Sequence, residues 1–174
     1  MVERLWRWSD EGRLPVVIDA ASCTGAIADP AEGVLSEENA ERLADLEILD
    51  SVAWAHDRLL PWLEVSEKVG SATVHPTCAT RRLALAHPLR ALTEALADEV
   101  YVAPSATCCA FAGDRGITHP ELTASATRPQ AEELAGRSFD ARLSSNRTCE
   151  IAMTRATGEP YDSVVCLLER LSRT

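Results

Sequence analysis

Short apolar runs alternate along this chain with longer stretches in which apolar residues recur at helical spacing. Four runs predict strands, at residues 14–19, 71–75, 99–103 and 141–144. Their apolarity is continuous rather than alternating, which is typical of strands buried on both faces of a parallel sheet. The pattern therefore predicts a parallel sheet with connecting segments on its faces.

The connecting segments have the periodicity of helices. Ser36 is suited to cap a long helix over 37–60, whose leucines share one face. A second helix is expected over 76–86, with His87-Pro88 breaking the apolar stripe that continues beyond it. A last helix is expected to begin near Pro160. Alternation of strands and helices predicts an α/β fold with a parallel, Rossmann-like sheet and flanking helices.

Composition and charge narrow the class of protein. The 174 residues fit one domain, with 17 Lys and Arg against 27 Asp and Glu, a net charge of −10. Such a charge disfavours binding to nucleic acid and to an anionic membrane surface. No segment has the apolar length of a transmembrane helix, and the N-terminus is too charged for a signal peptide. We expect a cytoplasmic protein, with any role at the inner face of the membrane depending on a partner.

The six cysteines are expected to be reduced thiols in such a protein. Five of them follow predicted strands: Cys23 the first strand, Cys78 the second, Cys108 and Cys109 the third, and Cys149 the fourth. Parallel sheets bind ligands outside the carboxyl ends of their strands. The sequence therefore predicts five cysteines along the functional edge of the sheet.

The surroundings of these cysteines favour thiolates, the form that binds a metal. Cys78 falls in the first turn of a predicted helix, where free backbone N–H groups lower the pKa of a thiol. Cys149 follows Arg147 and is also expected to open a helix. Cys108 and Cys109 cannot easily form a disulfide with each other, whereas two adjacent thiolates can bridge two metal atoms.

Less specific interpretations apply to other residues. Cys166, in the middle of the last predicted helix, is expected to act as a small apolar residue. Both a packing role and a ligand role stay open for Cys23. His75 is expected to be a satisfied histidine at a strand end, with roles as a ligand or as a donor to a ligand as the alternatives. Residues 22–27 also resemble 148–153, which allows a duplicated half-domain.

The cysteine pattern resembles the cysteine-rich "CCG" domain. That domain occurs in heterodisulfide reductase, in the iron–sulfur subunit of glycolate oxidase and at the C-terminus of FAD-linked D-lactate dehydrogenases. The stretches HPTCATRRL, CCAFAGDRGITHPELTASAT and SSNRTCEIAMTRATGEPY are similar to the last group. The resemblance runs from DAASCTGAI to the final helix, and so over essentially the whole chain.

The resemblance implies an iron–sulfur centre, a 4Fe–4S cluster, because such motifs in the reductase carry clusters held by five cysteines each. It assigns Cys78 as the first ligand, Cys108 and Cys109 as the central pair and Cys149 as the last ligand. Cys23 is similar to the last ligand of a preceding motif. The chain would then be a single CCG-type domain over 1–174, the C-terminal piece of a larger oxidoreductase with FAD on an upstream domain.

Two positions depart from the family pattern. Asn146 stands where the terminal CxxC has its first cysteine, and Ala110 stands where the family keeps glycine after the pair. Four cysteines suffice for an ordinary cluster but are one short of five. The alanine is harmless only at a negative φ.

Three functions follow from these observations. The first is electron transfer, in which electrons from a flavin that has oxidised D-lactate or another 2-hydroxy acid pass through a cluster towards a quinone or cytochrome. The second is a zinc-stabilised or metal-free interaction domain. The third is a thiol redox site formed by Cys108 or Cys109 with Cys78.

Overall fold

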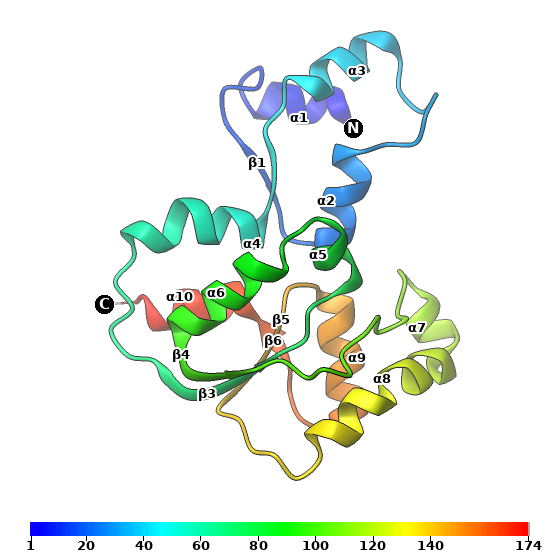
Figure 1. Cartoon of the computed structure of the whole chain (residues 1–174). Helices are drawn as coiled ribbons and strands as arrows, with labels where there is room; N and C mark the ends of the chain where they lie inside the picture. The colour runs from blue at the N-terminus through cyan, green and yellow to red at the C-terminus, as the bar shows by residue number, and fades with distance from the viewer. Residues whose placement is uncertain (174) are drawn as a thin grey trace.

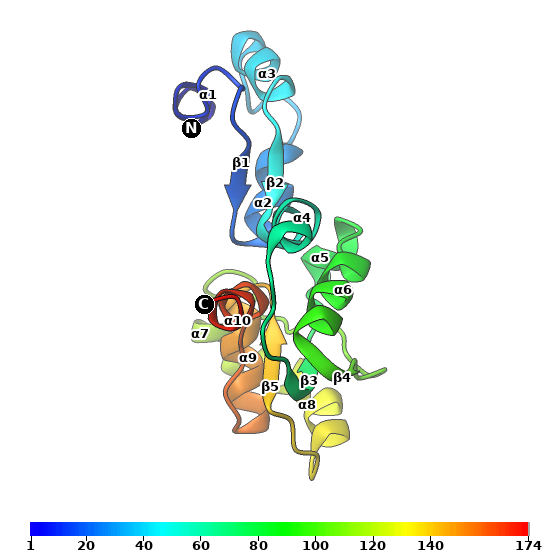
Figure 2. The same cartoon turned by 90° about the vertical axis from the view of Figure 1, so that its left-hand side faces the viewer.

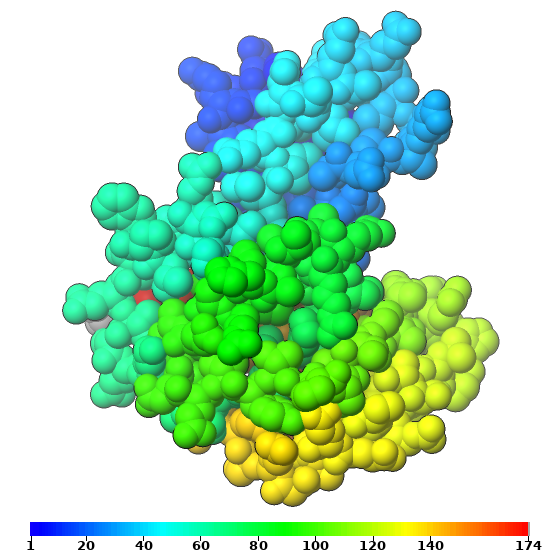
Figure 3. Space-filling view, viewed as in Figure 1, coloured from blue at the N-terminus to red at the C-terminus, as the bar shows by residue number. Residues whose placement is uncertain are grey.

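A computed structural model describes residues 1–173 of the chain. A small N-terminal lobe stands on a larger body that holds the main sheet (Figures 1 and 2). The space-filling view shows the lobe projecting from that body (Figure 3). Across these residues, no helix combines the length and the apolar character needed to cross a membrane.

The N-terminal lobe is built on two short strands. β1 and β2 pair in parallel, with Val16 opposite Ile48 and Ile18 opposite Asp50. Helix α2 contacts both strands, while α1 packs on α3. The elements of the lobe are α1 (Val2–Trp8), β1 (Val16–Ile18), α2 (Ala21–Ala28), α3 (Glu37–Ala44) and β2 (Ile48–Asp50).

The prediction of one long helix over 37–60 is wrong. Helix α3 ends at Ala44 and strand β2 follows it. A new helix, α4 (Ser51–Trp54), then continues as a π-helix, η1 (Ala55–Leu59), and a 3₁₀ turn, η2 (Leu60–Trp62). The Asp50 carboxylate starts α4 by accepting the backbone N–H of Val52 at 2.9 Å. The leucine spacing is helical, but pairing of β2 with β1 overrides it.

The main sheet confirms the predicted α/β fold. Its four strands are all parallel, in the order β4-β3-β5-β6. The chain runs from β3 to β4 on one side and then crosses to β5 on the other, so the topological switch point lies between β3 and β5. Strand β6 has only two residues and was not predicted. The strands are β3 (Val69–Val74), β4 (Ala97–Tyr101), β5 (Ala141–Ser144) and β6 (Asp162–Ser163).

Helices cover both faces of this sheet. One face packs against α4, α6 and α10 in the largest apolar core, which includes Val74, Leu92 and Leu143. The other face packs against α8 and α9, around Met153 and Tyr161. The helices of the body are α5 (Cys78–Arg82), α6 (Ala86–Leu96), α7 (Arg115–Thr118), α8 (Pro120–Leu134), α9 (Arg147–Thr157) and α10 (Val164–Leu171).

Capping side chains set where two of these helices begin. Helix α5 starts at Cys78 rather than at Pro76, because the Thr77 hydroxyl accepts the Thr80 N–H at 3.0 Å. The break before α6 lies at 83–85, where Ala84 has φ +57°, and not at His87-Pro88. Helix α10 starts at Val164 because β6 occupies part of the segment expected to be helical.

The two parts of the chain share a repeated arrangement. Cys23 is the third residue of α2, which follows β1, and Cys149 is the third residue of α9, which follows β5. Strands β1 and β5 each pair in parallel with a short strand that leads directly into a helix. Those junctions are Asp50-Ser51-Val52 and Asp162-Ser163-Val164. The matching order supports the predicted duplication of a half-domain.

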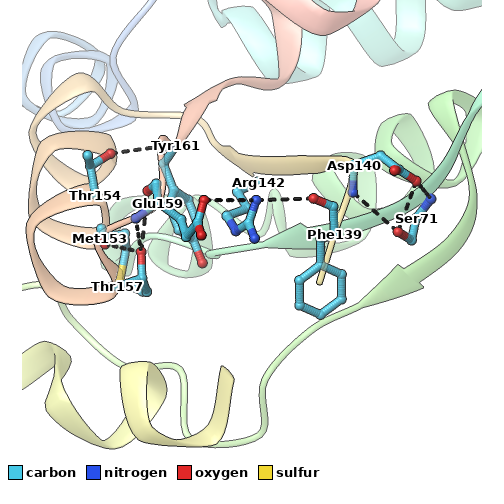
Figure 4. Close-up of polar contacts among 9 residues, drawn as sticks. All are labelled: Ser71, Phe139, Asp140, Arg142, Met153, Thr154, Thr157, Glu159 and Tyr161. Atoms are coloured by element: carbon cyan, nitrogen blue, oxygen red, sulfur yellow. Dashed lines mark hydrogen bonds and ion pairs between the residues drawn. The ribbon is translucent and has the colours of Figure 1, made fainter. Parts of the chain in front are cut away.

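Polar contacts hold the edge of the sheet at which β5 starts (Figure 4). The Asp140 carboxylate accepts the Ser71 N–H at 2.8 Å, and the Asp140 N–H donates to the Ser71 carbonyl at 3.0 Å. Arg142 donates to the Phe139 carbonyl at 3.1 Å and lies 3.7 Å from the Glu159 carboxylate. These contacts are at the opposite end of the strands from the cysteines, so they stabilise the sheet without entering the candidate site.

We expect Asp140→Ala to lower the free energy of unfolding by about 1 kcal/mol, because Ser71 loses its side-chain acceptor. Urea unfolding followed by far-UV circular dichroism measures the change. Asp98→Ala, at an exposed position on β4, is the matched control and should change stability less. Equal losses in the two variants would contradict the role given to Asp140.

Candidate metal centre

The residue after β3 is fixed by backbone contacts on two sides. The His75 N–H donates to the Leu143 carbonyl at 2.8 Å, and the His75 carbonyl accepts the Ser144 hydroxyl at 3.0 Å. The imidazole is 1% exposed. Three residues later, Cys78 opens α5 with its thiol near the surface. The carboxyl end of β3 therefore brings one buried nitrogen ligand and one exposed sulfur to the sheet edge.

The loop after β4 carries the adjacent cysteines. Arg81 of α5 donates to the Ala106 carbonyl at 2.6 Å and ties the start of this loop to the neighbouring helix. Phe111, 2% exposed, anchors its far side against Gly116. Between these anchors Cys109 points inwards and is 4% exposed, while Cys108 is exposed. The loop thus divides the pair into one buried and one exposed thiol.

Gly116 permits the tight packing of this loop. The Gly116 N–H donates to the Phe111 carbonyl at 2.8 Å, and a Cβ on Gly116 would lie 2.4 Å from the Phe111 ring. No side chain fits in that space. The ring in turn packs with Cys109, Cys149 and Ala152 in one apolar cluster, so the glycine sets the position of the buried thiol.

The buried sulfur atoms of Cys109 and Cys149 face each other. They lie 2.8 Å apart, which is longer than the ~2.05 Å of a disulfide bond. Cys149 is 3% exposed and comes from the first turn of α9. Together with His75 they form a group of three donors whose ligand atoms all lie within 4.8 Å of one another. The ends of β3, β4 and β5 each contribute one donor, as the position of the switch point requires.

Cys78 and Cys108 form the exposed side of the same cluster. Partial burial raises the pKa of the Cys78 thiol, and its hydrogen bond with Cys108 and the charges of Cys108 and Cys109 raise it further. The Cys108 sulfur also accepts the backbone N–H of Ala110 at 3.3 Å. Four of the predicted ligands therefore lie together, two buried and two at the surface.

The electrostatics of the cluster differ from the prediction. The hydrogen bond from Cys149 lowers the pKa of Cys109 to about 5, and that same hydrogen bond and burial raise the pKa of Cys149. The pKa of Cys78 is raised, so the expected lowering at a helix start is wrong, because burial and neighbouring thiols outweigh the helix. The guanidinium of Arg147 forms an ion pair with the Glu150 carboxylate at 3.0 Å rather than with the thiol of Cys149.

Two other cysteines lie outside this cluster. Cys23 is exposed on α2, and the group of buried donors found within residues 1–173 does not include it, so its role as a ligand stays a prediction. The neighbouring Ser22 accepts a hydrogen bond from Asn146 at 3.4 Å, which brings the starts of α2 and α9 together. Cys166 is exposed on α10, so its expected role in core packing is wrong.

The two departures from the family pattern have different consequences. Ala110 has φ +53°, in the left-handed region, so the condition for a harmless alanine is not met. Asn146 is the N-cap residue of α9 and directs its amide to Ser22. Sequence reasoning also missed Gln130, whose Oε1 lies 2.6 Å from Nδ1 of His75, because nothing in the sequence relates a residue within α8 to the end of β3.

We expect Gly116→Ala to lower the free energy of unfolding by about 2 kcal/mol, because the added methyl group displaces the Phe111 ring. Phe111→Leu is the companion variant. In a double-mutant cycle the two losses should add up to more than the loss in the double variant, since the smaller side chain makes room for the methyl group. Strictly additive losses would show that the ring and the glycine act independently.

We expect Ala110→Gly to raise the free energy of unfolding by about 1 kcal/mol, because glycine adopts a positive φ without steric cost. Ala131→Gly, within α8, is the matched control and should destabilise by a similar amount. Chemical denaturation of the three proteins measures both changes. Destabilisation by both glycines would contradict the strain assigned to Ala110.

Comparison with protein families matches residues 72–154 to the family described as "CCG: Cysteine-rich domain". The matched segment runs from β3 into α9 and contains Cys78, Cys108, Cys109 and Cys149. Among curated proteins, no sequence matches the chain. The segment 72–154 of this chain is therefore a cysteine-rich domain of the CCG family.

Proposed function

We propose that the cysteine edge of this domain binds an iron–sulfur cluster and transfers electrons. The observation that carries the proposal is the contact of the buried Cys109 and Cys149 sulfurs at 2.8 Å, with His75 beside them and Cys78 and Cys108 at the surface. Two cysteine sulfurs and an imidazole nitrogen that converge in this way are donors that can bind a metal.

The charges of the cluster support a bound cation. Burial and the neighbouring thiols raise the pKa of Cys78, and the hydrogen bond with Cys109, burial and the charges of the other thiols raise the pKa of Cys149, because thiolates in one small volume repel each other. A metal removes this repulsion, and cysteine binds metals as the thiolate. A bound cation would therefore favour the thiolate form of Cys78 and Cys149, whose pKa values are raised without it.

The number and position of the sulfur ligands support a cluster. Four cysteines suffice to hold an ordinary iron–sulfur cluster, which when bound accepts and releases single electrons. Two of the four are exposed, so such a centre would lie close to the surface. A redox centre near the surface can exchange electrons with a docked partner. This chain would contribute the ligands, the buried apolar residues packed against Cys109 and Cys149, and the exposed surface through which electrons reach the partner.

The identity of the partners rests on the resemblance of the chain to FAD-linked D-lactate dehydrogenases. On this proposal a flavin on another domain or subunit oxidises D-lactate or a related 2-hydroxy acid. Electrons then pass through the centre at Cys108 and Cys109 towards a quinone or cytochrome. The protein would work in the cytoplasm, with contact to the inner face of the membrane through a partner.

A second candidate is a structural zinc site. His75, Cys109 and Cys149 offer one nitrogen and two sulfur ligands within 4.8 Å, a donor set that suits tetrahedral zinc. One of the two exposed cysteines would complete the four ligands. In this case the metal would stabilise the sheet edge for binding to a partner protein, and no electron transfer would occur.

Analysis of iron, zinc and acid-labile sulfide in anaerobically purified protein separates the candidates. We expect iron and sulfide in the wild type, and their loss in Cys109→Ala and Cys149→Ala, which remove the buried pair. Cys166→Ala, on the exposed side of α10, is the control and should keep both.

Each other outcome has a distinct meaning. Zinc without sulfide would overturn the cluster and favour the structural site. Folded protein without either metal, and with a disulfide between Cys109 and Cys149, would overturn both and favour the thiol redox function, with a different pair from the one predicted with Cys78.

A further inference from the structure

We propose that His75 is a ligand of this metal centre through its Nε2 atom, and that Gln130 is a positioning residue that holds the imidazole in the required tautomer. The inference rests on the proposed metal-binding function and adds a nitrogen ligand to the cysteines. It follows from contacts on the two sides of the imidazole ring and from the burial of every group involved.

The contact with Gln130 sets the tautomer. Nδ1 of His75 lies 2.6 Å from Oε1 of Gln130, and an amide oxygen only accepts hydrogen bonds. With the Gln130 amide in this orientation, and its own nitrogen buried without a partner among the described residues, Nδ1 carries the proton and donates it, and Nε2 keeps a free lone pair. A neutral imidazole in this state is the form that binds metals, and a hydrogen bond at the other nitrogen orients such ligands in many metal sites.

The free nitrogen is buried without a partner among the described residues. Nε2 of His75 has no partner at hydrogen-bond distance in residues 1–173 and the side chain is 1% exposed, while the imidazole is near enough to the Cys109 thiol to help lower its pKa. A buried polar atom of this kind costs free energy unless something satisfies it. The sulfurs of Cys109 and Cys149 lie with the imidazole inside 4.8 Å. A cation between the three would satisfy the nitrogen and the two thiolates together.

The backbone of His75 is fixed by the neighbouring strand. Its N–H and carbonyl are both bonded to β5, at 2.8 and 3.0 Å, so the residue is fixed at the switch point between β3 and β5. Gln130 approaches from α8 and is itself 2% exposed. Strand β5 thus fixes the backbone of His75, and Gln130 of α8 holds its ring.

Asn146 leaves one possible ligand position at the start of α9 without a thiol. A cysteine three residues before Cys149 could be a further ligand. The residue there is Asn146, and its amide donates a hydrogen bond to Ser22. His75 reaches the same sulfur pair from the neighbouring strand. On this proposal the buried donors are His75, Cys109 and Cys149, with Cys78 and Cys108 at the exposed side of the centre.

Nuclear magnetic resonance of the full chain, labelled with ¹⁵N-histidine, tests the inference directly. Before metal is added, we expect the His75 ring to carry its proton on Nδ1. With ¹¹³Cd²⁺ as the probe, we expect a scalar coupling between the metal and Nε2 that disappears in His75→Gln. The matched control is His119→Gln, an exposed histidine beside Glu121, which should leave the coupling unchanged.

Gln130→Leu tests the positioning role separately. We expect cadmium affinity to fall about 10- to 100-fold and the ring to lose its preference for the Nδ1 proton, whereas Gln130→Glu, which keeps an oxygen acceptor, should retain both. A purely structural role for Gln130 would move the unfolding midpoint without changing the tautomer.

The two ways in which the inference can fail are distinguishable. Cadmium bound without any coupling to nitrogen, or a wild-type ring with its proton on Nε2, would overturn the role of His75 and leave the metal site standing. Absence of cadmium binding to the folded wild type would overturn the proposed metal-binding function and this inference with it.

Discussion

The close approach of the Cys109 and Cys149 sulfurs, 2.8 Å apart and out of contact with water, constrains the rest of the site. It requires the loop after β4 and the start of α9 to meet, although they are separated by α7, α8 and β5 along the chain. Phe111 and Gly116 supply the packing that makes this possible. Both thiols lie in an apolar cluster, and with His75 they form the group of buried donors that could hold a metal ion.

One end of the sheet carries stabilising polar contacts, and the other end carries the candidate metal site. At the start of β5, Asp140 and Ser71 close the sheet with hydrogen bonds, and Arg142 links it to the turn after α9. At the other end, the strands are followed by the loops and helices that carry His75 and the cysteines. Open parallel sheets bind ligands at that end because the chain diverges there, leaving side chains from separate segments free to converge.

Sequence reasoning predicted the parallel α/β fold and brought Cys78, Cys108, Cys109 and Cys149 to one edge, because strand ends determine that edge. It could not separate β2 from a helix, since Leu43, Leu46 and Leu49 follow helical spacing while pairing with β1 decides the outcome. Nor could it find the contact of Gln130 with His75, which depends on how α8 packs. The expected lowering of the pKa at Cys78 and Cys149 was wrong, because burial and thiols from other segments of the chain raise it.

X-ray absorption at the metal edge of anaerobically purified protein is the most direct test of a metal centre at these residues. The proposal predicts an iron edge with a first shell dominated by sulfur and a second shell of iron, both lost when Cys109 and Cys149 are replaced by alanine. A folded protein with no metal, or a metal surrounded only by oxygen and nitrogen, would contradict it.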